Sequence, residues 1–428
     1  MKLKKINHKD IKDILLKRSN HSAISLQQID ETVERIMQSV RLEGDRAVYQ
    51  YIKQLDGVEL ESFKVLEQEI EEAFNQVDAS SVQILSEAKE NILSYHKLQK
   101  EKSWYTNDQQ GIWLGQQVTP IERVGVYVPG GKASYPSTVL MSILPAKVAG
   151  VEKVVVTTPV QSNGSIHPTT LVAASMAGAD EILKIGGAHG IATLAYGTET
   201  IEPVHKIVGP GNAYVARAKK YVFGDVGIDL IAGPSEVCIL ADESANPQFV
   251  AADLLAQAEH DELASAIAVT TSEQLGSEIQ VEIKRQMKHR NRQEILNESI
   301  TNHGCIYIVD GLTSAFKFVN ELAPEHLELQ VENPFEQLEK VKHAGAIFLG
   351  NYSPEPLGDY FAGPNHTLPT NGTAKFSSPL GVYDFMKKSS VIYYDEKALN
   401  QVRQQVERFA ESEGLDAHKE SVRIRFEQ

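Results

Sequence analysis

An alternation of two kinds of segment, beginning at Arg123, constrains the fold of this chain more than any other feature. Short β-branched runs, RVGVYV, VEKVVVTT, DEILKI and VHKIV, are separated by segments of small residues at helical spacing such as STVLMSILPAKVAG and PTTLVAASMAG. Repetition of strand, turn and helix is typical of βαβ units, which build a parallel sheet covered by helices on both faces. The sequence therefore predicts an α/β fold.

A second series of the same kind follows the first. It begins at SEVCILAD, passes through the helical segment PQFVAADLLAQAEHD, and continues with the apolar runs SAIAVTT, CIYIV and AIFLG. Two series of this kind predict two Rossmann-like parallel-sheet domains in one chain. No GxGxxG motif occurs in either series, so the common dinucleotide fingerprint is absent.

Segments outside the two series predict a helical N-terminal segment and a C-terminal tail. Glu, Gln, Lys and Leu at helical spacing predict helices in residues 25–103, whereas residues 351–385 are dense in Gly, Pro, Asn and Ser and read as a long functional loop. The division we expect is an N-terminal helical segment 1–24, a discontinuous first domain 25–126 and 236–380, a second domain 127–235, and a C-terminal tail 381–428.

Charge and cysteine content exclude several classes of protein. The 42 Lys and Arg against 57 Asp and Glu give a net charge of −15, which argues against a nucleic-acid partner. Only two cysteines are present, Cys238 and Cys305, both inside apolar runs, so any metal must be held by nitrogen and oxygen ligands. No apolar run approaches the roughly 18 residues of a membrane helix. We expect a cytoplasmic protein that does not bind membranes.

Three glycine turns follow predicted strands and are candidate ligand-binding turns. They are Pro129-Gly130-Gly131, Gly186-Gly187 and Gly209-Pro210-Gly211-Asn212. Glycine lets the backbone approach a ligand, and the N-terminus of the following helix offers free N–H groups to a phosphate. The alternative is that these are simply tight turns between strand and helix.

Several polar residues have the spacing or the chemistry of a metal site. Gln257 and His260 are three residues apart late in a predicted helix, so they would share one face. Asp359 and His366 lie in the long loop, and His418 in the tail is a further candidate nitrogen ligand. Such side chains are acceptable ligands for Zn²⁺ or Mn²⁺. The alternative for the helical pair is a solvated helix end.

Glu325 and His326, in NELAPEHLEL, place an acid beside an imidazole directly after Pro324. A proline at this position predicts the start of a new helical turn, and the two side chains suit different roles in proton transfer. The alternative is an acid that stabilises a helix N-terminus beside a surface histidine.

The motifs taken together resemble the histidinol dehydrogenase family. The strings are VGVYVPGG, IGGAHGIATLAYGT, GPGNAYVARAK, DLIAGPSEV, DLLAQAEHD, LAPEHLEL, GDYFAGPNHTLPTNGTAKFSSPLGVYDFMK and GLDAHK, and they occur in the family's order over nearly the whole chain. The resemblance implies oxidation of L-histidinol through L-histidinaldehyde to L-histidine with two NAD⁺, as the last steps of histidine biosynthesis. It also implies one zinc ion per subunit, for which Mn²⁺ is a possible substitute, and a domain-swapped homodimer whose tail completes the partner's site.

The resemblance also assigns individual residues to roles. The implied zinc ligands are Gln257, His260, Asp359 and His418, and the implied acid–base pair is Glu325 and His326. The implied substrate contacts are Ser235, His366 and Glu413, together with the four zinc ligands and His326. The implied NAD contacts are Tyr127, Asn212 and His189, of which His189 stands where the family normally has Gln.

Two rival functions stay open at this point. A metal-dependent hydrolase would use the same ligands to activate water without a nucleotide. A non-catalytic metal- or ligand-binding protein would convert no substrate.

Overall fold

The computed structural model covers residues 1–428 and describes all of them except 7–9, 11–13, 15–22, 131–133 and 428. The chain forms two compact units. The first contains Met1–Gln99 and Ile121–Phe385, and the second contains Lys100–Pro120 and Met386–Gln428.

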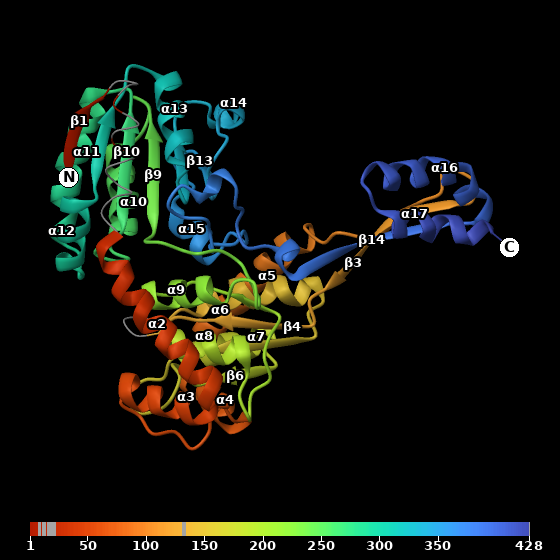
Figure 1. The fold of residues 1–428 in the computed structure, drawn as a ribbon. Helices are drawn as coiled ribbons and strands as arrows, with labels where there is room; N and C mark the ends of the chain where they lie inside the picture. The colour runs from red at the N-terminus through yellow and green to blue at the C-terminus, as the bar shows by residue number, and fades with distance from the viewer. Residues whose placement is uncertain (7–9, 11–13, 15–22, 131–133, 428) are drawn as a thin grey trace. The chain divides into compact units, whose positions relative to one another are not determined.

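A six-stranded parallel sheet forms one half of the first unit, with strand order β1-β11-β10-β9-β12-β13 (Figure 1). Its strands are β1 (Lys2–Lys5), β9 (Glu236–Ala241), β10 (Ser265–Thr270), β11 (Cys305–Ile308), β12 (His326–Gln330) and β13 (Ala346–Leu349). Its helices are α10 (Pro247–Ala258), α11 (Glu273–Met287), α12 (Gln293–Asn302), α13 (Leu312–Leu322), α14 (Pro334–Gln337) with η3 (Leu338–Lys340), and α15 (Glu355–Tyr360).

Alternate residues of β9 show why this sheet is covered on both faces. Val237, Ile239 and Ala241 pack in one apolar cluster with residues of α10, α11 and α12. Cys238 and Leu240 pack in a second cluster with residues of α13. Because successive side chains of a strand point to opposite faces, the continuous apolar run VCILA suits a parallel strand covered on both faces.

A five-stranded parallel sheet forms the other half of the first unit, with strand order β6-β5-β4-β7-β8. Its strands are β4 (Arg123–Tyr127), β5 (Lys153–Thr157), β6 (Glu181–Leu183), β7 (Lys206–Val208) and β8 (Gly227–Ile228). The helices between them are α6 (Pro136–Ala149), α7 (Pro168–Ala177), α8 (Gly187–Tyr196) and α9 (Ala213–Val222). The expectation of two Rossmann-like parallel sheets in an α/β chain is therefore confirmed.

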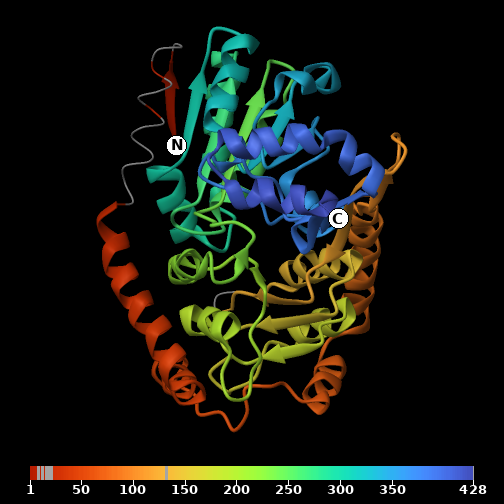
Figure 2. The same cartoon turned by 45° about the vertical axis from the view of Figure 1, so that its right-hand side comes forward.

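The N-terminal helices pack on the five-stranded half rather than on the six-stranded half (Figure 2). They are α2 (Ala23–Glu43), α3 (Asp45–Tyr51) with the π-helical turn η2 (Ile52–Asp56), α4 (Glu67–Gln76) and α5 (Ala79–Lys97). Val33, Met37 and Val40 of α2 share one buried cluster with residues of α8 and α9. This arrangement differs from the expected first domain, 25–126 with 236–380, because an apolar helix stripe does not reveal which sheet it will cover.

Residues Lys2–Lys5 form a strand, which differs from the helix expected for residues 1–24. They pair in parallel with β11 at the edge of the six-stranded sheet, where Leu3 packs against the core and Ile6 is buried. Most of the expected N-terminal helix, including 7–9, 11–13 and 15–22, lies outside the described residues. The charged and apolar residues at the start of the chain suit an edge strand that is half exposed.

The long segment 351–385 contains regular turns of its own. Besides α15 it holds two short 3₁₀ turns, η4 (Thr373–Lys375) and η5 (Val382–Phe385). Leu380, Val382 and Phe385 are buried, so apolar anchors hold its end against the first unit.

The second unit is built around a three-stranded antiparallel sheet with order β14-β3-β2. Its elements are β2 (Trp104–Thr106), β3 (Ile112–Pro120), β14 (Met386–Tyr394), α16 (Glu396–Ser412), α17 (Asp416–Arg423) and η6 (Ile424–Phe426). The expected tail thus pairs along the whole of β14 with β3, which the sequence analysis had placed in the first domain. This pairing joins residues far apart in the chain, which local patterns do not reveal.

Candidate active site

Glu325 and His326 stand at the start of β12, in the middle of the six-stranded sheet. The expected helical turn after Pro324 is wrong: α13 ends at Leu322, Ala323 adopts a left-handed conformation, and His326 is the first residue of a strand. The strand HLELQ is buried between β9 and β13, and its burial outweighs the local helix signal of the proline. Both side chains are therefore core residues, 5 % and 3 % exposed, and not surface groups.

The backbone of Glu236, the first residue of β9, holds both side chains. Its N–H donates to Glu325 Oε2 at 2.8 Å, and its carbonyl oxygen accepts a hydrogen bond from His326 Nδ1 at 3.1 Å. Because a carbonyl can only accept, Nδ1 carries the proton and Nε2 keeps its lone pair. Within the described part of the chain, Nε2 has no hydrogen-bond partner.

The free Nε2 atom of His326 faces two carboxylates. It lies 3.9 Å from Glu355 Oε1 and 4.0 Å from Asp359 Oδ1. Burial lowers the pKa of His326 to about 4, so the imidazole is neutral near pH 7. A neutral imidazole with an open nitrogen is the form that accepts a proton.

His260, Glu355 and Asp359 form a candidate metal site. One ligand atom from each lies within 4.8 Å of the other two. Glu355 is only 1 % exposed, and among the described residues no N–H or O–H group donates to either of its carboxylate oxygens. Burial and the nearby Asp359 carboxylate raise the pKa of Glu355 to about 10. A bound cation would relieve this cost, because it favours the charged form of the carboxyl groups.

Gln257, one turn before His260, is a candidate neutral oxygen ligand. Its side chain is completely buried on α10, and neither amide atom has a hydrogen-bond partner among the residues described. A buried amide without partners is costly unless a ligand satisfies it. Imidazole nitrogen, carboxylate oxygen and amide oxygen together fit a borderline cation such as Zn²⁺ or Mn²⁺.

Glu355 is a candidate site residue that was not expected from the sequence. It begins the short helix α15, four residues before Asp359, so both carboxylates share one helical face. The spacing E-x-x-x-D in EPLGDY is the signal that could have identified it.

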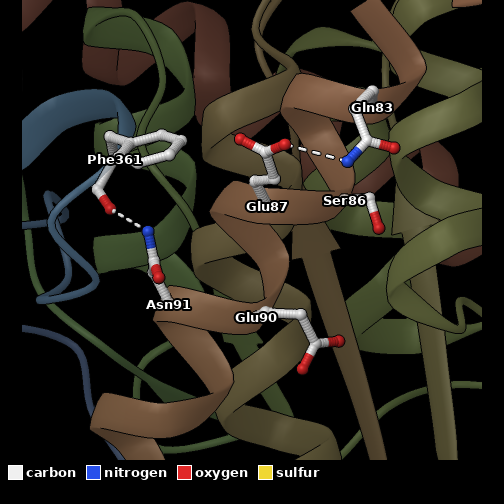
Figure 3. A pocket seen from close by; sticks show the side chains of 6 residues that line it. All are labelled: Gln83, Ser86, Glu87, Glu90, Asn91 and Phe361. Carbon is white, nitrogen blue, oxygen red and sulfur yellow. Dashed lines mark hydrogen bonds between the residues drawn. The ribbon is translucent and has the colours of Figure 1, made fainter.

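The segment after Asp359 is anchored to helices of the five-stranded half. Asn91 of α5 donates to the carbonyl of Phe361 at 2.9 Å, beside a shallow surface hollow lined by Gln83, Ser86, Glu87 and Glu90 (Figure 3). Asn365 donates to the carbonyl of Met141 on α6 at 2.6 Å. The loop that carries the candidate site residues is thus fixed to the other half of the unit.

His366 connects the same two halves through its ring. Its Nδ1 donates to the carbonyl of Asp359 at 2.9 Å, so Nε2 is the acceptor for the hydroxyl of Thr138 on α6, 3.3 Å away. Thr138 is 5 % exposed. The hydroxyl thus fixes the orientation of His366 beside Asp359 of the candidate metal site.

The five-stranded sheet presents a candidate nucleotide site at the carboxyl ends of its strands. Its strand order reverses between β4 and β7, and ligands of open parallel sheets bind at such a point. Tyr127 ends β4, and its hydroxyl accepts a hydrogen bond from the N–H of Gly187 at 3.1 Å. Gly209 follows β7 with φ +109°, and a Cβ there would lie 2.1 Å from the Tyr127 carbonyl oxygen. Only glycine fits at this position, because any side chain would collide with the backbone of Tyr127.

His189 and Asn212 occupy different environments at this edge. His189 is 1 % exposed, lies 5.9 Å from the ring of Tyr51, and has no hydrogen-bond partner for either ring nitrogen within the described chain. Burial lowers the pKa of His189 to about 4. Asn212 is exposed and caps α9 by accepting from the N–H of Val215 at 3.1 Å.

Comparison with known proteins identifies the family. The histidinol dehydrogenase family model matches residues 19–426. This chain belongs to the histidinol dehydrogenase family. It is 52 % identical to the histidinol dehydrogenase of Listeria innocua, with 96 % of each chain covered, and 54 % identical to that of Bacillus cereus, with 94 % of each covered.

A solved structure of a family member has the same fold. The histidinol dehydrogenase of Elizabethkingia anophelis superposes with a TM-score of 0.94 at 36 % identity, covering 99 % of this chain and 98 % of that one. None of the described helices is both long and apolar enough to span a membrane.

The site residues expected from the family resemblance fall into both units. The first unit contains Ser235, Gln257, His260, Glu325, His326, Asp359 and His366, and also Tyr127, His189 and Asn212. Ser235 is half-buried directly before Glu236. Glu413, which caps the end of α16, and His418, on α17, belong to the second unit, where both are exposed.

Proposed function

We propose that this chain oxidises L-histidinol through L-histidinaldehyde to L-histidine, with zinc bound and with two NAD⁺ as hydride acceptors, in the last steps of histidine biosynthesis. Membership of the histidinol dehydrogenase family supports the reaction. The observation that carries the proposal is the neutral His326, whose open Nε2 faces the carboxylates of a candidate metal site.

We assign Gln257, His260, Asp359 and His418 as the zinc ligands, with Mn²⁺ as a functional substitute. The bound cation would orient the imidazole and amino nitrogens of the substrate. Support comes from the unpartnered amide of Gln257 and from the close approach of His260 and Asp359. Glu355 belongs to the same cluster, and its carboxylate makes the electrostatic potential at the cation position more negative.

In the first oxidation, His326 Nε2 takes the hydroxyl proton of the substrate while the carbinol hydride passes to NAD⁺. The hydrogen bond from Nδ1 to the carbonyl of Glu236 keeps the ring in the tautomer that this step needs, and it stabilises the imidazolium that forms. Alcohol and NAD⁺ become aldehyde, NADH and one proton.

In the second oxidation, Glu325 takes a proton from the water that adds to the aldehyde, and His326 takes a proton from the resulting diol as the second hydride leaves. Burial raises the pKa of Glu325 well above its ordinary value, which makes its carboxylate a stronger base. Ser235, His366 and Glu413 are the proposed further substrate contacts.

For the nucleotide we assign Tyr127, His189 and Asn212 as contacts. Two features support a nucleotide at this edge: the strand order reverses between β4 and β7, and Gly209 approaches the backbone of Tyr127 closely. Because His189 is buried, we propose that its contact with the nucleotide is made by packing of the ring and not by a hydrogen bond at the surface.

We further propose a homodimer in the cytoplasm, in which Glu413 and His418 of one subunit complete the site of the other. Apolar side chains exposed on the second unit, among them Ile392, Phe409 and Ile424, support a partner surface there. The buried positions of Cys238 and Cys305 suit a reducing compartment.

One assay tests the proposed reaction. Purified chain loaded with Zn²⁺ is mixed with L-histidinol and NAD⁺, and NADH and L-histidine are measured. We expect two NADH for each L-histidine formed. Folded, zinc-loaded chain that produces no NADH would contradict the dehydrogenase and favour a hydrolase or a non-catalytic binding protein.

A further inference from the structure

Lys219 of α9 is almost completely buried and forms an ion pair with Asp229, the residue that follows β8. The two side chains are 2 % and 1 % exposed. Lysine is rarely buried to this extent, because removing both charges from water costs more than a simple ion pair returns. An apolar pair of similar volume would fill the same space without that cost.

Both charged groups also hold the backbone of one residue, Gly209. Lys219 Nζ donates to the Gly209 carbonyl oxygen at 2.8 Å, and the Gly209 N–H donates to Asp229 Oδ2 at 2.8 Å. The two backbone polar groups of this glycine are therefore fixed by the two partners of one buried ion pair. Charge-assisted hydrogen bonds of this kind are stronger and more directional than neutral ones.

The position of Gly209 determines the shape of the turn at the candidate nucleotide site. It begins the turn Gly209–Asn212 at the reversal of strand order, and it touches the neighbouring strand so closely that a Cβ would lie 2.1 Å from the carbonyl oxygen of Tyr127. A Cβ on Gly211 would likewise lie 3.1 Å from the ring of Tyr127. A shift of the turn would move the backbone groups that a ligand at this edge meets.

The same sheet contains a similar arrangement that is less buried. Asp180 Oδ2 accepts from Lys147 Nζ at 2.6 Å and from the N–H of Val154 at 2.7 Å, near the start of β5. These two charged side chains are 27 % and 25 % exposed. They stand at the amino ends of the strands, the edge opposite to the glycine turns, and so provide a matched comparison.

We propose that Lys219 and Asp229 are positioning residues for the nucleotide: they hold the turn Gly209–Asn212 in the shape that receives NAD. The inference rests on the proposed function, because it presumes that NAD binds at this edge. Neither side chain touches the nucleotide in this proposal, since each is buried and acts through the backbone of Gly209.

The test compares two neutralised ion pairs. The variant Lys219→Met/Asp229→Asn removes both charges together, so no buried charge is left alone, and Lys147→Met/Asp180→Asn is the control. For each, NADH binding is measured by fluorescence titration, histidinol binding by calorimetry, and folding by circular dichroism and thermal melting. Steady-state KM values for NAD⁺ and L-histidinol are measured on zinc-loaded enzyme.

We expect the Lys219/Asp229 variant to bind NADH about tenfold more weakly, the loss that one charge-assisted hydrogen bond can cause. The KM for NAD⁺ should rise in parallel, while histidinol binding stays within twofold of wild type. The control pair should change the melting temperature without changing NADH affinity.

Three outcomes would overturn the inference: a folded variant with unchanged NADH affinity, an equal loss in the control, or an equal loss of histidinol affinity. If the double variant fails to fold, Lys219→Gln/Asp229→Asn takes its place, since it also leaves no buried charge alone and keeps polar groups at both positions. Wild-type enzyme that binds no NADH would instead contradict the proposed function. The ion pair would then have only a structural role.

Discussion

The imidazole of His326 donates its Nδ1 proton to the backbone carbonyl of Glu236, 3.1 Å away, on the neighbouring strand. The same residue's N–H holds the Glu325 carboxylate at 2.8 Å. The backbone of one residue thus orients two adjacent side chains, and His326 Nδ1 lies 3.7 Å from Glu325 Oε2. Because a backbone holds them, their geometry depends on strand pairing and does not depend on the side chain of Glu236.

Replacing Glu325 by Gln should separate the two oxidation steps. Gln keeps an oxygen that can accept from the N–H of Glu236, but it cannot take a proton from water. We expect aldehyde oxidation to fall by about 100-fold or more and alcohol oxidation to fall much less. Single-turnover rates of NADH formation from L-histidinol and from L-histidinaldehyde measure the difference. Equal losses in both steps would argue against Glu325 as the water activator.

Removing the imidazole of His260 should abolish tight zinc binding. His260→Ala deletes one donor of the candidate site, and we expect metal affinity to fall at least about tenfold. Zinc content after dialysis, measured by elemental analysis, reports the loss. His289→Ala is the control, because His289 is an exposed histidine at the end of α11. Zinc retention equal to wild type in His260→Ala would reject the ligand assignment.

The hydroxyl of Thr138 should matter for the substrate and not for the nucleotide. Thr138→Val has nearly the same shape but cannot donate to His366 Nε2, whereas Thr138→Ser can. We expect kcat/KM for L-histidinol to fall about fivefold to tenfold in the Val variant, the effect of about 1 kcal/mol from one hydrogen bond. The Ser variant should recover most of this loss. Val and Ser variants of equal activity would show that the hydroxyl does not position His366.

The buried His189 should make folding stability depend on pH. Its pKa is lowered to about 4 in the folded chain and lies near 6.5 when unfolded. Between these values the unfolded chain binds more protons, so the contribution of His189 to stability decreases as the pH falls from 6.5 towards 4.

Comparison with His189→Gln isolates this effect from that of the buried carboxyl groups. From pH 7 to pH 5, wild type should lose about 2 kcal/mol of unfolding free energy relative to the Gln variant. Denaturant unfolding at the two pH values measures it. An unchanged difference between the two proteins would show that His189 is not held neutral by burial.

Mixed dimers test whether the second unit acts on a partner. If Glu413 and His418 complete the partner's site, combining Glu325→Ala subunits with His418→Ala subunits creates one site in which every group is intact. We expect activity to reappear on mixing, up to about one site in four for random pairing of equal amounts. Mixed dimers confirmed by mass spectrometry but devoid of activity would indicate a site built within one chain.

Local sequence patterns were sufficient for the strands and for much of the candidate site. Apolar runs such as VCILA predicted doubly covered parallel strands, because both faces of such a strand pack against helices. Gln257, His260 and Asp359 stood out by residue type and spacing, and the motif order identified the family. Glu355 was missed although its spacing to Asp359 was visible, because a lone glutamate in a proline-rich segment resembles a surface residue.

The sequence by itself thus determined the α/β class and the family. Only the tertiary structure decided which sheet the helices of residues 23–99 cover, that Glu325 and His326 stand on a strand, and that Lys219 and Asp229 meet at Gly209. The physical reason is the same in each case. Local residue preferences act over a few positions, whereas burial and hydrogen bonding between distant segments decide which of the compatible local structures is adopted.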